Sequence, residues 1–325
     1  MLGAVIYNIS GLISKKYTAG IRSMNKLIII TGPTASGKSG LGIQLAKKYN
    51  GEIVSADSRQ VYTGLDIGSG KVTAEEMQGI PHYLLDVAMP NDFFSLFDFQ
   101  QQAYAAIDDI ISRNKNAFLV GGTGLYVNAV ADGYHVGNSA PDLKLRKELN
   151  EKTLLELIDI IKSNCPEMLD RIDLKNKQRV ERAAEKALIG DTGISENTPR
   201  YDTLVLGCNW PRPMLYGRIR KRLDLRLADG MIDEVVNLRK NGATDEFLYK
   251  LGLEYRYILM YLRNEFESFD AFYDKLFMEI RHLAKEQMTW FRKRKDIIWI
   301  DFSDTSASPE EAAAKYIDSF LSDQA

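Results

Sequence analysis

Residues 32–39 read GPTASGKS, a spacing of glycine, lysine and serine that can hold a chain of phosphates. The backbone N–H groups of such a loop point at anionic oxygens, the lysine adds a mobile positive charge, and the serine hydroxyl can ligate Mg²⁺. The pattern alone leaves the owner of the phosphates open. We predict a diphosphate or nucleotide site, with Mg²⁺ bound partly through water at Ser39, formed by Gly32, Pro33, Thr34, Ala35, Ser36, Gly37, Lys38 and Ser39.

A carboxylate is expected beside this loop. An enzyme that hydrolyses ATP or GTP usually has a second strand that ends in an acid and holds the metal. The segment FLVGG at 118–122 ends in glycines instead, whereas the segment at 51–58 ends in SADS and places Asp57 at the carboxyl end of a strand. Asp57 could hold water on a metal ion or accept a proton from a nucleophile.

Apolar strands and amphipathic helices must position these groups. Strands are predicted at residues 25–31, 51–58 and 116–122, with helices at 38–49 and 98–115 between them. This alternation indicates a P-loop-type α/β fold, in which a parallel sheet carries helices on both faces. A further strand at 201–210 and a short last strand at 297–302 flank a long helical stretch.

The chain divides into a tail, a core and an insertion. Charged helical segments from about Pro141 to Pro199 contain no convincing strand. We therefore expect an accessory tail at 1–24, a P-loop catalytic core at 25–138 and 200–325, and an all-helical insertion domain at 139–199. The tail is too short and too polar to span a bilayer, and its lysines follow its apolar part, unlike those of a signal peptide. Met24 is a candidate natural start.

The composition narrows the class of protein. The 325 residues are 45% hydrophobic and 26% charged, which is enough for a full core. The formal net charge of −2 argues against a protein that is basic throughout, although local basic faces remain compatible with it. Cys165 and Cys208 are far apart and predict neither a disulfide framework nor a zinc site. We expect a cytoplasmic monomer with no membrane partner.

Five motifs follow one another in the order and at the spacing of the tRNA dimethylallyltransferases, also called tRNA isopentenyltransferases. Besides GPTASGKS, they are EIVSADSRQVYTGLDIGSGK at 52–71, GIPHYLLDV at 79–87, FSLFDFQQQA at 94–103 and FLVGGTGLYVNAV at 118–130. Together, SADSRQVY and GGTGLY are far more specific than the phosphate loop. The resemblance extends from Lys26 to about Phe302 and weakens in the insertion.

This resemblance implies a prenyl transfer. The loop would bind the diphosphate of dimethylallyl diphosphate, and the acceptor would be the N6 amine of the adenosine just 3′ of the anticodon in tRNA. Asp57 resembles the family's general base, which would help because an adenine amine is a poor nucleophile. Thr34 resembles the residue whose hydroxyl reaches the departing phosphate, and Arg222 the arginine that contacts the diphosphate from outside the loop.

The resemblance also implies contacts with the tRNA anticodon stem-loop. The segment DSRQ would contact the flipped adenosine and its neighbours, Thr123 would line the same channel, and KQRVERA in the insertion would bind the anticodon loop. The tRNA-binding residues implied in this way are Asp57, Ser58, Arg59, Gln60, Thr123, Lys144, Gln178, Arg179, Val180, Glu181, Arg182, Tyr255 and Arg256.

Two residues depart from the family pattern, and one histidine needs an interpretation. Glu254 replaces the usual glycine before Tyr255, and Glu286 stands where a basic residue is commoner. For His82, we expect a packing or hydrogen-bonding role.

Two alternative functions remain open. A small-molecule or nucleoside kinase would share the loop and Asp57, with the insertion as a lid. A nucleotide-regulated RNA-binding module would fit the loop and the basic insertion but would give Asp57 no task.

Overall fold

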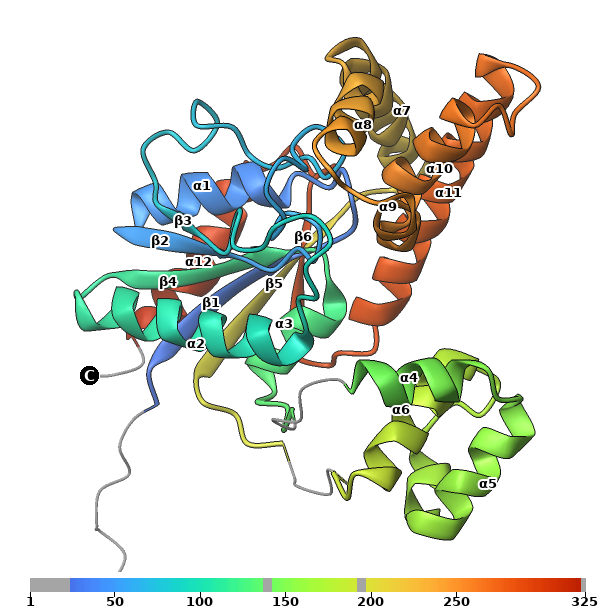
Figure 1. Ribbon diagram of the computed structural model, residues 1–325. Coiled ribbons are helices and arrows are strands. Elements are labelled where there is room, and N and C mark those ends of the chain that lie inside the picture. Colours follow the sequence, from blue (N-terminus) through green and yellow to red (C-terminus); the bar gives the residue numbers. More distant parts are fainter. Residues whose placement is uncertain (1–23, 137–141, 192–196, 323–325) are drawn as a thin grey trace, which may run out of the picture.

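The computed structural model describes residues 24–136, 142–191 and 197–322 (Figure 1). At its centre is a six-stranded sheet with the order β3-β2-β4-β1-β5-β6, and every neighbouring pair of strands is parallel. The carboxyl ends of the strands therefore meet at one edge, which confirms the predicted P-loop-type α/β class. The strands are β1 (Lys26–Thr31), β2 (Gly51–Ser55), β3 (His82–Tyr83), β4 (Asn116–Gly121), β5 (Asp202–Asn209) and β6 (Ile297–Asp301).

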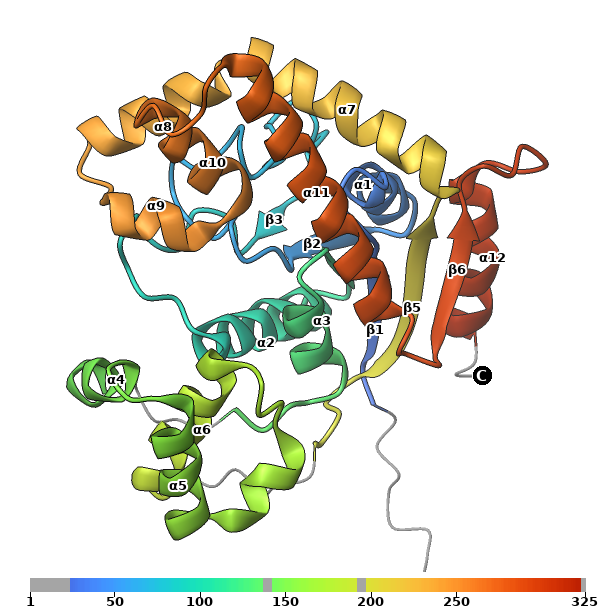
Figure 2. The same cartoon turned by 90° about the vertical axis from the view of Figure 1, so that its right-hand side faces the viewer.

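Helices cover both faces of the sheet (Figure 2). Successive side chains of a strand point to opposite faces, and β1 is apolar on both. Ile28 packs with Leu41 of α1 on one face, whereas Ile29 packs with Phe99 of α2 on the other. The two layers are α1 (Lys38–Lys48) with α12 (Pro309–Ser322), and α2 (Leu96–Ser112) with α3 (Gly124–Ala131).

The edge strand β3 is a feature that the sequence did not indicate. It has two residues, both only half-buried, so no apolar run marks it. It pairs with Ile53 and Val54 of β2. Nδ1 of His82 lies 2.8 Å from the carbonyl oxygen of Ile80, so the expected hydrogen-bonding role of His82 is confirmed.

The insertion forms a helical lobe set apart from the sheet (Figures 1 and 2). Its described residues form helices joined by short loops, with no strand, and the helices pack around a small core of their own that includes Leu149, Leu157 and Ile161. This confirms an all-helical insertion, whereas the exact boundaries at 139 and 199 stay a prediction. The helices are α4 (Leu143–Asn150), α5 (Leu154–Asn164), the 3₁₀ helix η2 (Pro166–Arg171) and α6 (Lys177–Leu188).

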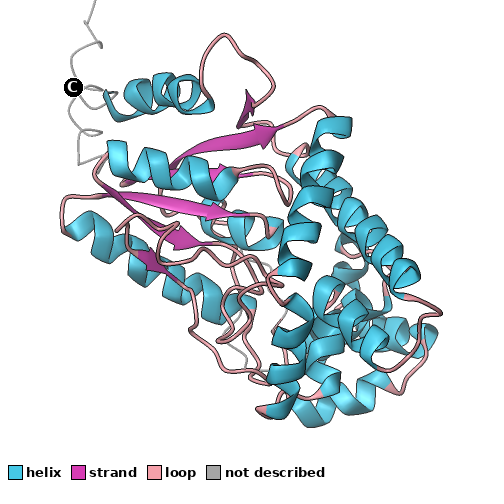
Figure 3. Ribbon diagram, turned by 90° about the horizontal axis from the view of Figure 1, so that it is seen from above, coloured by secondary structure: helices cyan, strands magenta, loops and turns pink. Residues whose placement is uncertain are grey.

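A second group of helices lies beyond the end toward which the strands point (Figure 3). Ile219, Val235 and Ile280 belong to the apolar cluster that joins these helices. Because this bundle faces the carboxyl edge of the sheet, it can supply side chains to a ligand bound there. Its members are α7 (Arg212–Ala228), α8 (Met231–Lys240), α9 (Asp245–Leu251), α10 (Leu253–Leu262) and α11 (Phe269–Phe291). Within the described ranges, no helix combines the length and apolar content needed to cross a bilayer.

Candidate active site

The phosphate loop joins β1 to α1 at the carboxyl edge of the sheet. Gly32 has φ 150° and Gly37 has φ 94°, conformations that residues with a side chain rarely adopt. A Cβ on Gly32 would lie 2.9 Å from Ser36 Oγ and 3.0 Å from the carbonyl oxygen of Cys208. Gly37 is also the N-cap of α1, so the positive end of this helix meets the loop. The backbone therefore has the shape and polarity of an anion site.

Three arginines spaced four residues apart on α7 lie along this loop. Nε of Arg218 donates to the carbonyl oxygen of Ala35 over 2.9 Å. One turn later, Nη2 of Arg222 donates to the hydroxyl oxygen of Thr34. Arg226, a further turn along, lines the cavities on either side of the loop. α7 therefore adds positive charge to the site from outside the loop, as the resemblance implied for Arg222.

Burial and repulsion between cations lower the pKa of two positively charged side chains of the site, Lys38 and Arg222. Burial lowers the pKa of Lys38 to about 8, although the nearby Asp57 carboxylate opposes this shift. Burial, and then the positive charge of Arg226, lowers the pKa of Arg222 to about 9. Both groups are charged at neutral pH but partly desolvated and crowded by like charge. A bound anion would relieve that cost.

Asp57 lies in the loop that follows β2, across the sheet edge from Lys38. Its Oδ1 accepts a hydrogen bond of 3.0 Å from the backbone N–H of Arg59. Among the described residues, Oδ2 has no hydrogen-bond partner. Beside it, Oγ1 of Thr123 accepts from the backbone N–H of Ser58 over 3.0 Å and so ties the loop after β2 to the loop after β4.

A cavity of about 310 Å³ brings these groups together. Its polar wall includes Lys38 and Asp57, and its apolar wall includes Leu125, Leu283 and Trp290. This combination fits a small anionic ligand with an apolar part. The full lining is Thr34, Lys38, Asp57, Ser58, Arg59, Gly68, Ser69, Gly122, Thr123, Gly124, Leu125, Arg226, Glu254, Leu283, Glu286, Gln287 and Trp290.

Two side chains of α11 complete the site, and the sequence analysis did not name either. Oε1 of Gln287 accepts from the backbone N–H of Thr34 over 2.7 Å, and its Nε2 donates to the carbonyl oxygen of Gly122 over 2.9 Å. Trp290 packs against Gly124 so closely that a Cβ there would lie 2.3 Å from Cδ1 of the indole. Gln287 therefore fixes the phosphate loop relative to the loop after β4.

A second cavity, of about 620 Å³, opens on the α7 side of the phosphate loop. Ser39, Lys71 and Lys221 are part of its lining, and Lys38 and Arg226 line both cavities. The phosphate loop can therefore be approached from two sides.

Tyr255 is buried and supports the site from behind. Its hydroxyl donates to Oε1 of Glu234 over 3.0 Å. The same carboxylate accepts the backbone N–H groups of Asp66, Ile67 and Gly68 over 2.6 to 3.0 Å. The Tyr255 side chain therefore has no exposed surface with which to make the implied RNA contact. Its ring packs in the helical bundle, and its hydroxyl is bound to Glu234, which in turn holds the 66–68 loop.

The other residues implied to bind tRNA fall into two groups. Asp57, Ser58, Arg59 and Thr123 line the 310 Å³ cavity, whereas Gln60 donates through Nε2 to the carbonyl oxygen of Gly70 over 3.1 Å. Arg256 lines a groove of about 640 Å³ beside it. On the helical lobe, Lys144, Gln178 and Arg179 are exposed, Glu181 and Arg182 are partly exposed, and Val180 is buried in the lobe's core. Burial removes the Val180 side chain from any direct RNA contact.

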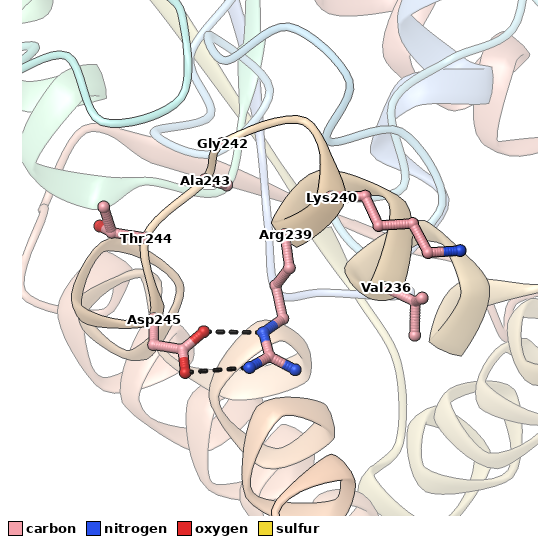
Figure 4. A pocket seen from close by; sticks show the side chains of 7 residues that line it. All are labelled: Val236, Arg239, Lys240, Gly242, Ala243, Thr244 and Asp245. Atoms are coloured by element: carbon pink, nitrogen blue, oxygen red, sulfur yellow. Dashed lines mark hydrogen bonds and ion pairs between the residues drawn. The ribbon is translucent and has the colours of Figure 1, made fainter.

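A further cavity, of about 680 Å³ between α8 and α9, contains no comparable chemistry (Figure 4). Its one carboxylate is already paired: Nε of Arg239 donates to Oδ1 of Asp245 over 2.7 Å, and Arg263, from outside the cavity, donates to Oδ2 over 2.8 Å. The phosphate loop, Asp57 and the α7 arginines therefore mark the site.

Comparison with known proteins shows the family of the chain. The IPP transferase family model matches residues 60–294, a range that begins after the phosphate loop and Asp57 and includes the insertion and α7 to α11. The chain belongs to the IPP transferase family. Two relatives of this IPP transferase are the tRNA dimethylallyltransferase 2 of Citrifermentans bemidjiense, 43% identical, and the tRNA dimethylallyltransferase 1 of Syntrophus aciditrophicus, 40% identical. Each alignment covers 89% of this chain, and 95% and 97% of the respective relative.

Solved structures give the same family. The tRNA isopentenylpyrophosphate transferase of Bacillus halodurans is 37% identical, with a TM-score of 0.68 over 91% of this chain and 95% of that one. A eukaryotic dimethylallyltransferase acting on tRNA is 25% identical, with a TM-score of 0.78 over 93% of this chain and 80% of that one. These comparisons favour neither the kinase nor the non-catalytic RNA-binding module.

Proposed function

We propose that this IPP transferase transfers the dimethylallyl group of dimethylallyl diphosphate to the N6 amine of the adenosine 3′-adjacent to the anticodon in tRNA, releasing diphosphate. The observation that carries the proposal is one cavity in which Asp57 and apolar side chains lie beside a cation-lined phosphate loop. The names of the relatives and of the solved structures support the same reaction.

The phosphate loop stabilises the leaving group in this proposal. As the allylic carbon–oxygen bond breaks, its electron pair stays on the diphosphate, whose negative charge grows. The backbone N–H groups of the loop, Lys38 and Arg222 are fixed where that charge develops, and such groups stabilise a transition state more than a ground state. In the absence of dimethylallyl diphosphate, the Thr34 hydroxyl oxygen accepts a hydrogen bond from Arg222, so the arginine is already directed at the loop.

Asp57 acts as the general base. The N6 lone pair forms the new bond to the allylic carbon, and the N6 proton passes to the carboxylate during attack. One oxygen of Asp57 is held by the backbone N–H of Arg59, while the other has no hydrogen-bond partner among the described residues, so it can accept the proton. A positioned base contributes about a hundred- to ten-thousandfold to rate. The apolar wall formed by Leu125, Leu283 and Trp290 suits the dimethylallyl group.

Mg²⁺ fits the first turn of α1 as a companion of the diphosphate. The Ser39 hydroxyl has no hydrogen-bond partner within the described ranges, and those ranges contain no group of three acids, histidines or cysteines that could hold a metal alone. Mg²⁺ typically binds through phosphate oxygens and water with few protein ligands. Ser39 would therefore hold the ion, which would neutralise charge on the departing diphosphate.

The tRNA partner is the anticodon stem-loop, bound by a monomer in the cytoplasm. In this proposal, the core (25–138 and 200–325) receives the flipped adenosine, and the insertion (139–199) binds the anticodon loop through Lys144, Gln178, Arg179 and Arg182. Phosphate contacts of this kind supply most of the affinity for RNA. The phosphate loop borders two cavities that share Lys38 and Arg226, so there is space for two substrates beside it.

The test is transfer of radiolabelled dimethylallyl from its diphosphate to unmodified tRNA, followed by digestion and identification of the modified nucleoside. A parallel reaction with ATP measures nucleotide consumption. We expect label on N6 of the adenosine next to the anticodon and no ATP turnover above background. ATP turnover without prenylation would support a kinase instead, and RNA binding without either reaction would support the non-catalytic module.

A further inference from the structure

Glu254 is a buried carboxylate at the first turn of α10, on the wall of the 310 Å³ cavity. Its side chain is only 5% exposed. The backbone before it is unusual, since Gly252 has φ 73° and Leu253 has φ 38°. Because a buried carboxylate is costly unless it is paired, Glu254 requires compensating positive charge.

Two arginines supply that charge from different elements. Oε2 of Glu254 lies 3.5 Å from Nη1 of Arg59, and Oε1 lies 3.6 Å from Nη1 of Arg226. Arg59 comes from the loop after β2, next to Asp57, and Arg226 comes from α7. Each arginine has a second anchor: Nε of Arg59 donates to the carbonyl oxygen of Leu251, and Nη1 of Arg226 donates to that of Gly68. Glu254 is thus the common partner of the Asp57 side and the phosphate side of the cavity.

The distances show that this bridge is loose. Tight charge-assisted hydrogen bonds between arginine and carboxylate measure about 2.7–2.9 Å, and both contacts of Glu254 are longer. Each arginine is therefore directed by Glu254 without being locked to it. Arg226 also lies close to Lys38 and Arg222 and lowers the pKa of both, whereas Glu254 raises the pKa of Arg222. Without Glu254, Arg226 would lose its ion-pair partner and keep the repulsion from Lys38 and Arg222, and Arg59 would lose its contact with the Glu254 carboxylate.

We propose that Glu254 is a positioning residue that holds Arg226 toward the diphosphate and Arg59 toward the acceptor before either substrate binds. The inference rests on the proposed function for the identity of the two ligands. For the change in anion affinity when the Glu254 charge is removed, this proposal predicts the opposite sign from simple charge balance. If Glu254 only reduced the positive potential of the site, removing its charge would strengthen anion binding; if it positions Arg226, removing its charge weakens anion binding.

The experiment measures binding of inorganic diphosphate with Mg²⁺ to the full chain by calorimetry. We expect Glu254→Gln to bind diphosphate about tenfold more weakly than the wild type, a size typical of coupled neighbouring charges. The matched control is Glu286→Gln, because Glu286 lines the same cavity and has no ion pair within the described ranges. Its removal should leave diphosphate binding equal or tighter, as charge balance alone requires.

A double-mutant cycle tests the contact itself. Arg226→Gln should weaken diphosphate binding in the wild-type background, and Glu254→Gln should add little to it, because the arginine that Glu254 positions is then absent. Equal or tighter binding by Glu254→Gln, equal weakening by Glu254→Gln and Glu286→Gln, or additive losses in the double variant would overturn the proposal.

Two further measurements separate the role of Glu254 from a folding defect and from a failure of the proposed function. If Glu254→Gln does not fold, as judged by thermal melting, Glu254→Asp retains the charge but is one methylene too short to reach both arginines. It should bind diphosphate with an affinity below that of the wild type, and wild-type affinity would contradict the inference. A wild-type chain that binds diphosphate but transfers no prenyl group would refute the proposed function alone, since diphosphate binding does not require transfer.

Discussion

Arg222 of α7 donates a hydrogen bond from Nη2 to the hydroxyl oxygen of Thr34, within the phosphate loop. The two residues are far apart in the sequence, and the contact places a cation from the helical bundle at a loop built by the sheet. The backbone N–H of Thr34 is held in turn by Gln287 of α11. The loop therefore acts together with two helices that the phosphate-binding pattern itself does not include.

Replacement of Arg222 should slow transfer. We expect Arg222→Gln to lower kcat about a hundredfold, because the site loses a donor directed at the charge that develops on the leaving diphosphate. Steady-state kinetics with labelled donor measure the effect. Arg220→Gln is the matched control, since Arg220 lies on the same helix but stacks on Phe277, 4.4 Å from its ring centre. Similar losses in both variants would show that α7 matters only as a scaffold.

Diphosphate affinity should depend on pH through Lys38. The pKa of this side chain is about 8, and the charged form exists below that value. Affinity for inorganic diphosphate should therefore be full below pH 8 and fall as the pH rises through it. Calorimetry between pH 6.5 and 9.5, a range of about three units around that pKa, measures the dependence. Lys38→Met, compared over the same range, corrects for titration of the ligand, and an identical pH dependence in both proteins would contradict the assignment.

Gly124 should tolerate no side chain. A Cβ there would lie 2.3 Å from Cδ1 of Trp290, so Gly124→Ala must displace the indole from the cavity wall. We expect a lower melting temperature and a higher KM for the prenyl donor. Gly217→Ala is the control, because a Cβ at Gly217 meets nothing within 4 Å and the position is inside α7. That variant should be stabilised by about 0.5–1 kcal/mol. Unchanged donor KM in Gly124→Ala would remove Trp290 from the donor site.

The exposed basic residues of the insertion should affect RNA binding without affecting the donor. Arg179→Gln should weaken binding of an anticodon stem-loop and lower the slope of log K against log salt by about one. Diphosphate binding should not change. The control is Lys240→Gln, an exposed lysine at the end of α8 next to the unrelated cavity of Figure 4. An equal loss in both variants would indicate nonspecific attraction by surface charge.

Among the strands that the structure describes, all but β3 were predicted from the sequence, as was the phosphate loop, but only part of the site was. Gly32, Gly37 and Lys38 are local to one motif between a strand and a helix, so their spacing is enough to predict the loop. Gln287 and Trp290 reach the cavity only because α11 packs beside the loop, and no local pattern marks them. Arg226 did carry a signal, since Arg218, Arg222 and Arg226 recur at the spacing of one helical face.

Burial separated residues that the resemblance had grouped. Tyr255 and Arg256 are adjacent in the sequence, yet Tyr255 is buried against Glu234 whereas Arg256 lines an open groove. Val180 is likewise enclosed between neighbours that face solvent. Neighbouring residues on a helix point about 100° apart, so a contiguous motif cannot contact one ligand with every side chain. The roles of the remaining implied residues stay predictions.

The rate of transfer by Asp57→Asn tests the central claim most directly. Asparagine keeps the shape of the side chain and its acceptor for the Arg59 N–H, but it cannot take the N6 proton. In a single-turnover experiment with labelled dimethylallyl diphosphate and excess enzyme, we expect the rate of transfer to tRNA to fall about a hundred- to ten-thousandfold. Affinities for diphosphate and for the stem-loop should remain close to those of the wild type. Transfer at the wild-type rate by Asp57→Asn would contradict the account.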